Sequence, residues 1–169
     1  MTKDTFILLA RPDQLRQLQG WDVIPAHLAY RIGRGPHLFR AGGGAVPRGG
    51  LMVVADQDFD GLGPAAPFCQ EVVRECQARG FTGAILDFEG RLPPLEQMAA
   101  QLDETFFHRG WVLYVPEAYG ACAPHAKVMI PSALSGGSLA LRLQEARERF
   151  GRDRVALALE KTAGDFFLP

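Results

Sequence analysis

Short apolar segments alternate with helix-like segments along most of this chain, and this alternation constrains the fold more than any other feature. The strand-like runs are residues 5–10, 23–31, 51–56, 83–88, 111–116, 127–131 and 155–160. The clearest helical patterns cover residues 66–78, 95–107 and 139–150. Strands separated by helices form βα units with a parallel sheet. The sequence therefore predicts an α/β fold, a parallel TIM-barrel-like sheet that is incomplete or trimmed, with about seven strands.

Composition indicates one domain over residues 1–169. A chain of 169 residues with 47% hydrophobic content can bury a substantial core. The net charge is -1, with Lys and Arg scattered, so we expect no nucleic-acid partner and no anionic membrane surface as partner. No run approaches the roughly 18 apolar residues of a membrane span. The apolar run near the N-terminus is too short for a signal peptide, so we expect a cytoplasmic protein.

Two connections depart from the βα pattern. Residues 33–50 are rich in glycine and read as a long loop, which is either a binding element or a mobile insertion. Residues 116–124 join two predicted strands without an evident helix. These connections favour a trimmed barrel over a complete one.

The predicted strand 83–88 delivers two carboxylates near its end. Side chains alternate across a strand, so Asp87 and Glu89 are expected on the same face. Two carboxylates this close repel each other when both are ionised, which raises one pKa and keeps a proton available for general acid catalysis. The alternative is structural, because such residues also cap a following helix or pair with a nearby cation, here Arg91.

Residues 82–89 resemble the signature Asp-Gly-x-Asp-x-Asp-x-Glu of the chitinase-like family 18 glycoside hydrolases, which lies on the fourth strand of a (β/α)8 barrel. Gly83, Asp87 and Glu89 match this signature. Thr82 and Ile85 stand where the family has its first two Asp residues. The strand that carries the carboxylates is also the fourth of the predicted strands.

The resemblance implies roles for the matched residues. Glu89 would be the proton donor, and Asp87 would support the acetamido group of the substrate, which is the nucleophile in this family. Ile85 replaces the buried Asp beneath them, and Pro131 stands where the family's sixth strand has an assisting Tyr. The resemblance therefore implies a glycoside-hydrolase-like protein that acts on or binds N-acetylated saccharides, with a degenerate motif. The alternative is a catalytically inactive barrel that binds a saccharide or a protein partner.

Other acidic residues follow predicted strands, and we expect them at the same mouth. The carboxyl ends of barrel strands meet at one end, where barrel active sites gather. With one aromatic neighbour included, the substrate-binding candidates are Asp56, Asp58, Glu117, Tyr119 and Glu160.

Metal and cofactor motifs give no support to other classes of enzyme. Residues 56–61 begin like a calcium-binding loop, but Pro67 stands where a bidentate Glu is required. The 4 histidines show no metal-ligand spacing. Motifs of serine hydrolases, phosphate-binding loops and dinucleotide sites are missing from the sequence. We therefore predict no metal and no cofactor.

A barrel of about seven strands would leave a sheet edge unpaired. Such an edge invites pairing with another chain. We expect a homo-oligomer through this edge, unless the chain is part of a longer product or an eighth strand lies in the glycine-rich region.

Overall fold

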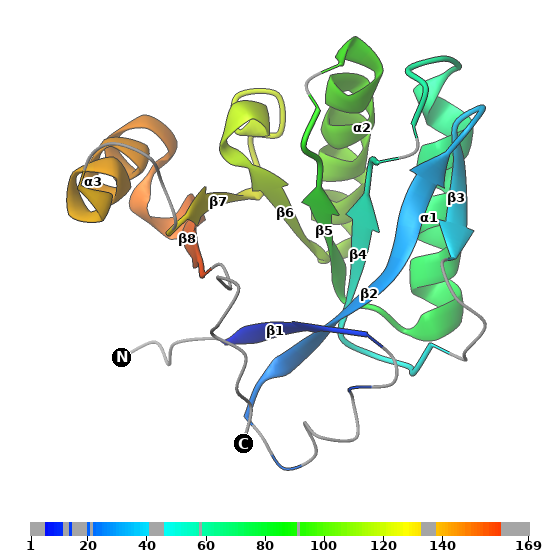
Figure 1. Cartoon of the computed structure of the whole chain (residues 1–169), viewed down its shortest axis with the longest axis horizontal. Coiled ribbons are helices and arrows are strands. Elements are labelled where there is room, and N and C mark those ends of the chain that lie inside the picture. Colours follow the sequence, from blue (N-terminus) through cyan, green and yellow to red (C-terminus); the bar gives the residue numbers. More distant parts are fainter. Residues whose placement is uncertain are drawn as a thin grey trace.

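The computed structural model describes residues 6–11, 14, 20, 22–40, 46–57, 59–90, 92–132 and 138–159. Within these ranges, parallel strands form a curled, open sheet in the order β1-β2-β4-β5-β6-β7-β8 (Figure 1). Their bounds are β1 Ile7–Ala10, β2 Ile24–Gly33, β4 Leu51–Ala55, β5 Gly83–Asp87, β6 Val112–Pro116, β7 Lys127–Pro131 and β8 Val155–Ala158. The predicted strands match these bounds within two residues. The predicted fold class, an incomplete parallel barrel, is confirmed.

Three α-helices in the described residues follow strands β4, β5 and β7. They are α1 Ala65–Arg79, α2 Pro93–Arg109 and α3 Leu139–Phe150. A proline at the first position favours the start of α2, because proline's fixed φ suits that position and its missing N–H is not needed there. Gly80 and Gly110 end α1 and α2 in the left-handed conformation. The predicted helices agree with these bounds within two residues.

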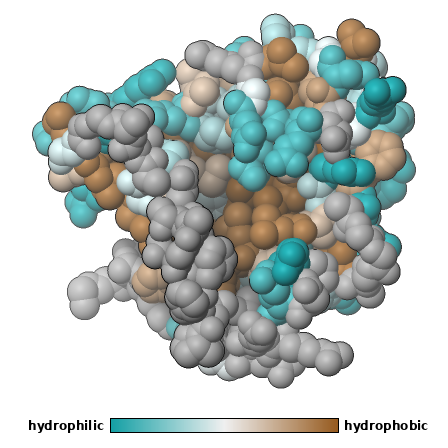
Figure 2. Space-filling view, in the orientation of Figure 1, coloured by the Kyte–Doolittle hydropathy of each residue, from teal (hydrophilic) through white to brown (hydrophobic). Residues whose placement is uncertain are grey.

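The sheet buries apolar side chains on both faces. Side chains on the outer face pack against α1 and α2, as Met52, Val54 and Leu86 do against Phe68 and Leu102. Side chains on the inner, concave face form a second cluster of Ala26, Leu51, Val53 and Ile85, with Tyr114 and Met129 at its margin. Figure 2 shows apolar side chains in the middle of one face of the molecule, with hydrophilic side chains next to them. The alternation of side chains along each strand places these clusters on opposite faces.

The glycine-rich segment contains a strand, so the prediction of a loop over all of residues 33–50 is wrong. Strand β3, His37–Arg40, pairs antiparallel with the end of β2 after a tight turn. Gly35 has φ of +100° in this turn, a conformation that glycine adopts at little cost. The many Gly and Pro residues of this segment favoured the prediction of a loop, so the four-residue strand β3 was missed. Because β3 pairs with β2 alone among the described strands and lies outside the path of parallel strands, it does not close the barrel.

Shorter elements complete the described part of the chain. The connection from β6 to β7 contains the 3-10 helix η2, Glu117–Tyr119, followed by turns, as the lack of a helical pattern predicted. A second 3-10 helix, η3, covers Arg152–Arg154 before β8. Of the helices in the described ranges, none is long and apolar enough to cross a membrane.

Candidate functional site

Asp87 and Glu89 lie together at the carboxyl end of β5. Both side chains are exposed, whereas Phe88 between them is 5% exposed and packs into the outer core. Ile85, two residues before Asp87, belongs to the inner cluster. Because side chains alternate along the strand, Asp87 points to the same concave side as Ile85. Glu89 follows the end of β5 and lies close enough for its charge to raise the pKa of Asp87.

Apolar side chains of the concave face lie next to these carboxylates. Ile85 is 4% exposed and packs with Leu51 and Val53 on the inner face. Partial burial of the Asp87 carboxyl raises its pKa above the ordinary value, and the negative charges of Glu89 and Asp56 raise this pKa further. Asp87 therefore holds a proton more readily than an isolated aspartate does.

Asp56 binds the backbone of the segment that follows β5. It comes directly after β4 and is 9% exposed. Its Oδ1 accepts a hydrogen bond from the Glu89 backbone N–H at 3.0 Å, and its Oδ2 accepts one from the Gly90 N–H at 2.9 Å. Both oxygens of this carboxylate therefore bind consecutive amides next to the candidate acid.

Tyr119 binds the same segment from the other side. It lies in η2 after β6 and is 1% exposed. Its hydroxyl donates a hydrogen bond to the Gly90 carbonyl oxygen. Its ring meets the Phe88 ring edge-on, with the centroids 5.7 Å apart. The segment from Phe88 to Gly90 is thus held from the ends of both strands that flank β5.

Of the remaining candidates, the structure describes Glu117. Glu117 forms an ion pair with Arg142 of α3 at 3.5 Å, and Arg142 also donates to the Pro131 carbonyl oxygen at 3.3 Å. Asp58 and Glu160 lie outside the described residues, and so does Arg91, the alternative partner of the carboxylates. Within the described part of the chain, no group of three or more His, Cys, Asp or Glu side chains could hold a metal ion.

The structure adds one cation that sequence reasoning missed. Arg31, Ala55 and Asp87 are register partners on neighbouring strands, so they form one row across β2, β4 and β5. With strands about 4.8 Å apart, the Cα atoms of Arg31 and Asp87 are separated by about 10 Å. Arg31 is exposed, and the pairing of the strands places it on the concave side. Its position at the end of a predicted strand was the signal that could have identified it.

Comparisons with known proteins support the fold. A scan against protein-family models gives no match to this sequence, and a search of curated proteins gives none either. Among solved structures, a chitinase from Chromobacterium violaceum ATCC 12472 is similar, with a TM-score of 0.63 and 16% identity over 91% of this chain and 68% of the chitinase chain.

Two further solved structures have a similar fold. The spore cortex-lytic enzyme SleL from Bacillus megaterium QM B1551 has a TM-score of 0.65 and 11% identity over 90% of this chain. The alignment covers 49% of the SleL chain, so this chain spans about half of that enzyme. A class V chitinase from Pseudomonas fluorescens Pf-5 has a TM-score of 0.59 and 15% identity over 90% of this chain and 67% of its own. The described sheet therefore has the glycoside-hydrolase-like fold of the chitinases, as the resemblance of residues 82–89 implied.

Proposed function

We propose that this chain is a glycoside-hydrolase-like protein that acts on or binds N-acetylated saccharides, with Glu89 as proton donor and Asp87 as its partner. One observation carries the proposal. Two exposed carboxylates, Asp87 and Glu89, lie close together at the carboxyl end of β5, in a sheet with the fold of chitinases. Barrel enzymes place their reacting groups at this end of the strands.

The chemistry follows the substrate-assisted scheme that the resemblance implies. Glu89 gives its proton to the glycosidic oxygen as the bond from that oxygen to the anomeric carbon breaks. The acetamido oxygen of the substrate forms a bond to the same carbon, while Asp87 holds the acetamido N–H. Water then attacks the anomeric carbon as the bond from the acetamido oxygen to that carbon breaks, and the Glu89 carboxylate takes the proton from that water. Asp58, Glu117 and Glu160 are proposed to contribute to saccharide binding, and the scheme needs no cofactor.

Two residues favour the alternative, a catalytically inactive barrel that binds a saccharide or a protein partner. Ile85 is packed in an apolar cluster where the family has an Asp that relays charge. Pro131 ends β7 where the family has a Tyr that assists the acetamido group. Both substitutions remove support for the reacting groups and leave Asp87 and Glu89 in place. Turnover that is slow or absent, with binding retained, would favour this alternative.

The test is hydrolysis of a chito-oligosaccharide by the wild type and by Glu89→Gln, with calorimetric binding measured on both. If Glu89 is the acid, Glu89→Gln should lower turnover by roughly two or more orders of magnitude and retain binding. Glu104→Gln is the matched control, since Glu104 is an exposed carboxylate on α2. A wild type that neither hydrolyses nor binds N-acetylated saccharides would refute the proposal.

A further inference from the structure

We infer that Asp56 and Tyr119 are positioning residues, which aim the Glu89 side chain by fixing the backbone on both sides of Gly90. This inference rests on the proposed function of Glu89. It differs from the sequence prediction that Asp56 and Tyr119 bind substrate directly. Asp56 and Tyr119 follow β4 and β6, the two strands that flank β5, and neither is on β5 itself.

The carboxylate of Asp56 is well placed for this role. Ala55 is the register partner of Asp87, so the next residue, Asp56, lies level with the segment after β5. Hydrogen bonds from backbone amides to an ionised carboxylate are about twice as strong as those between neutral groups. The fit is close, because a Cβ added at Gly90 would lie 3.1 Å from Oδ2 of Asp56. The segment therefore has little freedom on the side of β4.

Tyr119 completes the restraint on the side of β6. Its hydroxyl binds the Gly90 carbonyl oxygen, while Asp56 binds the Gly90 N–H. The contact between the rings of Tyr119 and Phe88 fixes the residue that precedes Glu89. The exposed Glu89 carboxylate then takes its direction from a fixed backbone. A displacement of about 1 Å can cost a factor of about one hundred in rate, so this restraint bears on catalysis.

Asp56 also acts on the site through its negative charge. This electrostatic effect would not be expected of a residue that only supports the backbone. Its negative charge raises the pKa of Asp87, so its removal should lower that pKa. Glu89 acts in the same direction, and Arg31 carries the opposite charge in the same row. On the other side of β5, the β6 residue that packs against the inner cluster is Tyr114. Its side chain is a phenol and not a charged group.

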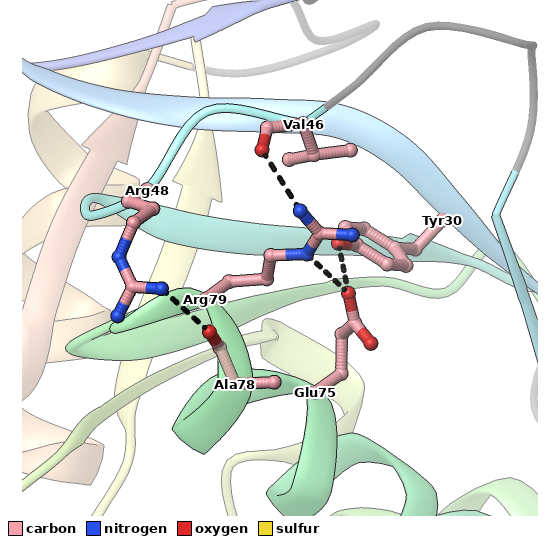
Figure 3. Close-up of polar contacts among 6 residues, drawn as sticks. All are labelled: Tyr30, Val46, Arg48, Glu75, Ala78 and Arg79. Carbon is pink, nitrogen blue, oxygen red and sulfur yellow. Dashed lines mark hydrogen bonds and ion pairs between the residues drawn. The ribbon is translucent and has the colours of Figure 1, made fainter.

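The chain offers a matched pair of variants, Tyr119→Phe and Tyr30→Phe. Both tyrosines are buried, and each hydroxyl donates one hydrogen bond. Figure 3 shows the hydroxyl of Tyr30, on β2, and the guanidinium of Arg79, on α1, both bound to the Glu75 carboxylate of α1. Each variant loses a buried hydrogen bond, and the loss of stability should be at least as large in Tyr30→Phe, because the partner of Tyr30 is a carboxylate. We expect Tyr119→Phe to lower kcat tenfold or more with KM changed less than twofold, and Tyr30→Phe to change neither by more than twofold.

Asp56→Asn tests the same inference without an assay of activity. Asn offers one acceptor oxygen, and its NH2 group would face the second amide N–H. Hydrogen exchange at the Glu89 and Gly90 amides should become at least tenfold faster, with exchange at the Phe81 amide unchanged. The pKa of Asp87, followed by carboxyl NMR, should fall in this variant. Asp60→Asn is the control, since the exposed Asp60 carboxylate accepts from the N–H of Leu62, two residues along the chain.

The outcomes separate the inference from the proposed function. If the wild type shows no turnover, the enzymatic proposal fails, and amide exchange still decides whether Asp56 fixes the segment. Equal losses of kcat in Tyr119→Phe and Tyr30→Phe would overturn the inference. Unchanged exchange at both amides in Asp56→Asn would overturn it as well. If Asp56→Asn does not fold, the pair of tyrosine variants decides.

Discussion

The protonation of Asp87 depends on its neighbours. Its place over Ile85 and near two other carboxylates raises its pKa, in the order burial, Glu89 and Asp56. A carboxyl with a raised pKa in the folded state binds protons more tightly there than in the unfolded chain. Ionised Asp87 therefore opposes folding at neutral pH, and this cost falls as pH drops through its raised pKa. Such a cost is typical of a residue retained for chemistry.

Asp87→Asn should consequently stabilise the fold at pH 7. The variant removes an ionised group that is unfavourable in the folded state, so its melting temperature should exceed that of the wild type. The advantage should shrink as pH falls through the raised pKa and disappear below 3.8, the ordinary value for Asp, where the wild-type carboxyl is protonated in both states. Thermal unfolding at several pH values measures this, with Asp60→Asn as the control. A difference in melting temperature that does not depend on pH would contradict the account.

The sequence predicted the site at the level of single residues only in part. The period of a strand was enough to place Asp87 on the face of Ile85, and the shared face of Asp87 and Glu89 stays a prediction. The contacts of Asp56 and Tyr119 could not be predicted, because their partners are backbone atoms of residues 33, 34 and 29 positions away. Such contacts depend on the register of three strands, which no local pattern encodes.

At the scale of elements, β5 and β6 approach closely because Gly83 has no side chain. A Cβ at Gly83 would lie 2.1 Å from the Val112 carbonyl oxygen, which belongs to the backbone of β6. The strand pairing starts at these two residues, since Gly83 is the register partner of Val112. The glycine that matches the family signature thus has a packing role at the start of the strand that carries the carboxylates.

Gly83→Ala should destabilise the protein by about 1–3 kcal/mol, the usual cost of overpacking a core. The added methyl group must push β6 away or shift β5, because the atom it meets is part of the main chain. Thr82→Ala is the control, since Thr82 is exposed and its backbone carbonyl still accepts from Val112 N–H. Urea unfolding measures both variants. A cost for Gly83→Ala no larger than that for Thr82→Ala would show that the strands can move apart freely.

Helices and strands with a clear apolar period were predicted well, and β3 was not. Its four residues follow a turn with Gly and Pro, and too few residues alternate to reveal a strand. The position of β3 depends on contacts with α1, which is distant in the sequence. The Glu71 carboxylate of α1 accepts from the Leu38 N–H at 2.8 Å and lies 3.1 Å from His37 Nδ1. A contact between a helix and a strand more than 30 residues apart leaves no local signal.

At the scale of the whole molecule, the parallel sheet is open. In the order of strands found among the described residues, β1 and β8 are the two ends. The concave face carries exposed apolar side chains, with Leu9 45%, Ile24 36% and Leu28 40% exposed. The order of the strands could be predicted from βα units, which place successive strands side by side with one handedness. The length of each strand and the curl of the sheet could not, because both depend on side-chain packing.

The sequence-based expectation of a homo-oligomer belongs to this scale and stays a prediction. Contiguous exposed apolar surface favours association, so light scattering should show a mass above that of one chain at micromolar concentration. Leu28→Lys, on the concave face, should shift the mass towards one chain. Phe107→Lys is the control, because Phe107 is 56% exposed on α2, away from that face. A wild type that stays monomeric at all concentrations would contradict the prediction.

The most direct test of the account is a crystal structure of Glu89→Gln with a chito-oligosaccharide. The variant should bind the saccharide without cleaving it, so the intact ligand can be located. We expect the sugar across the carboxyl ends of the strands, with one glycosidic oxygen within about 3 Å of the residue 89 side chain, the reach of a general acid. The acetamido group of the adjoining sugar should contact Asp87. A saccharide bound elsewhere on the molecule, with no sugar oxygen near residue 89, would contradict the assignment of Glu89 as the proton donor.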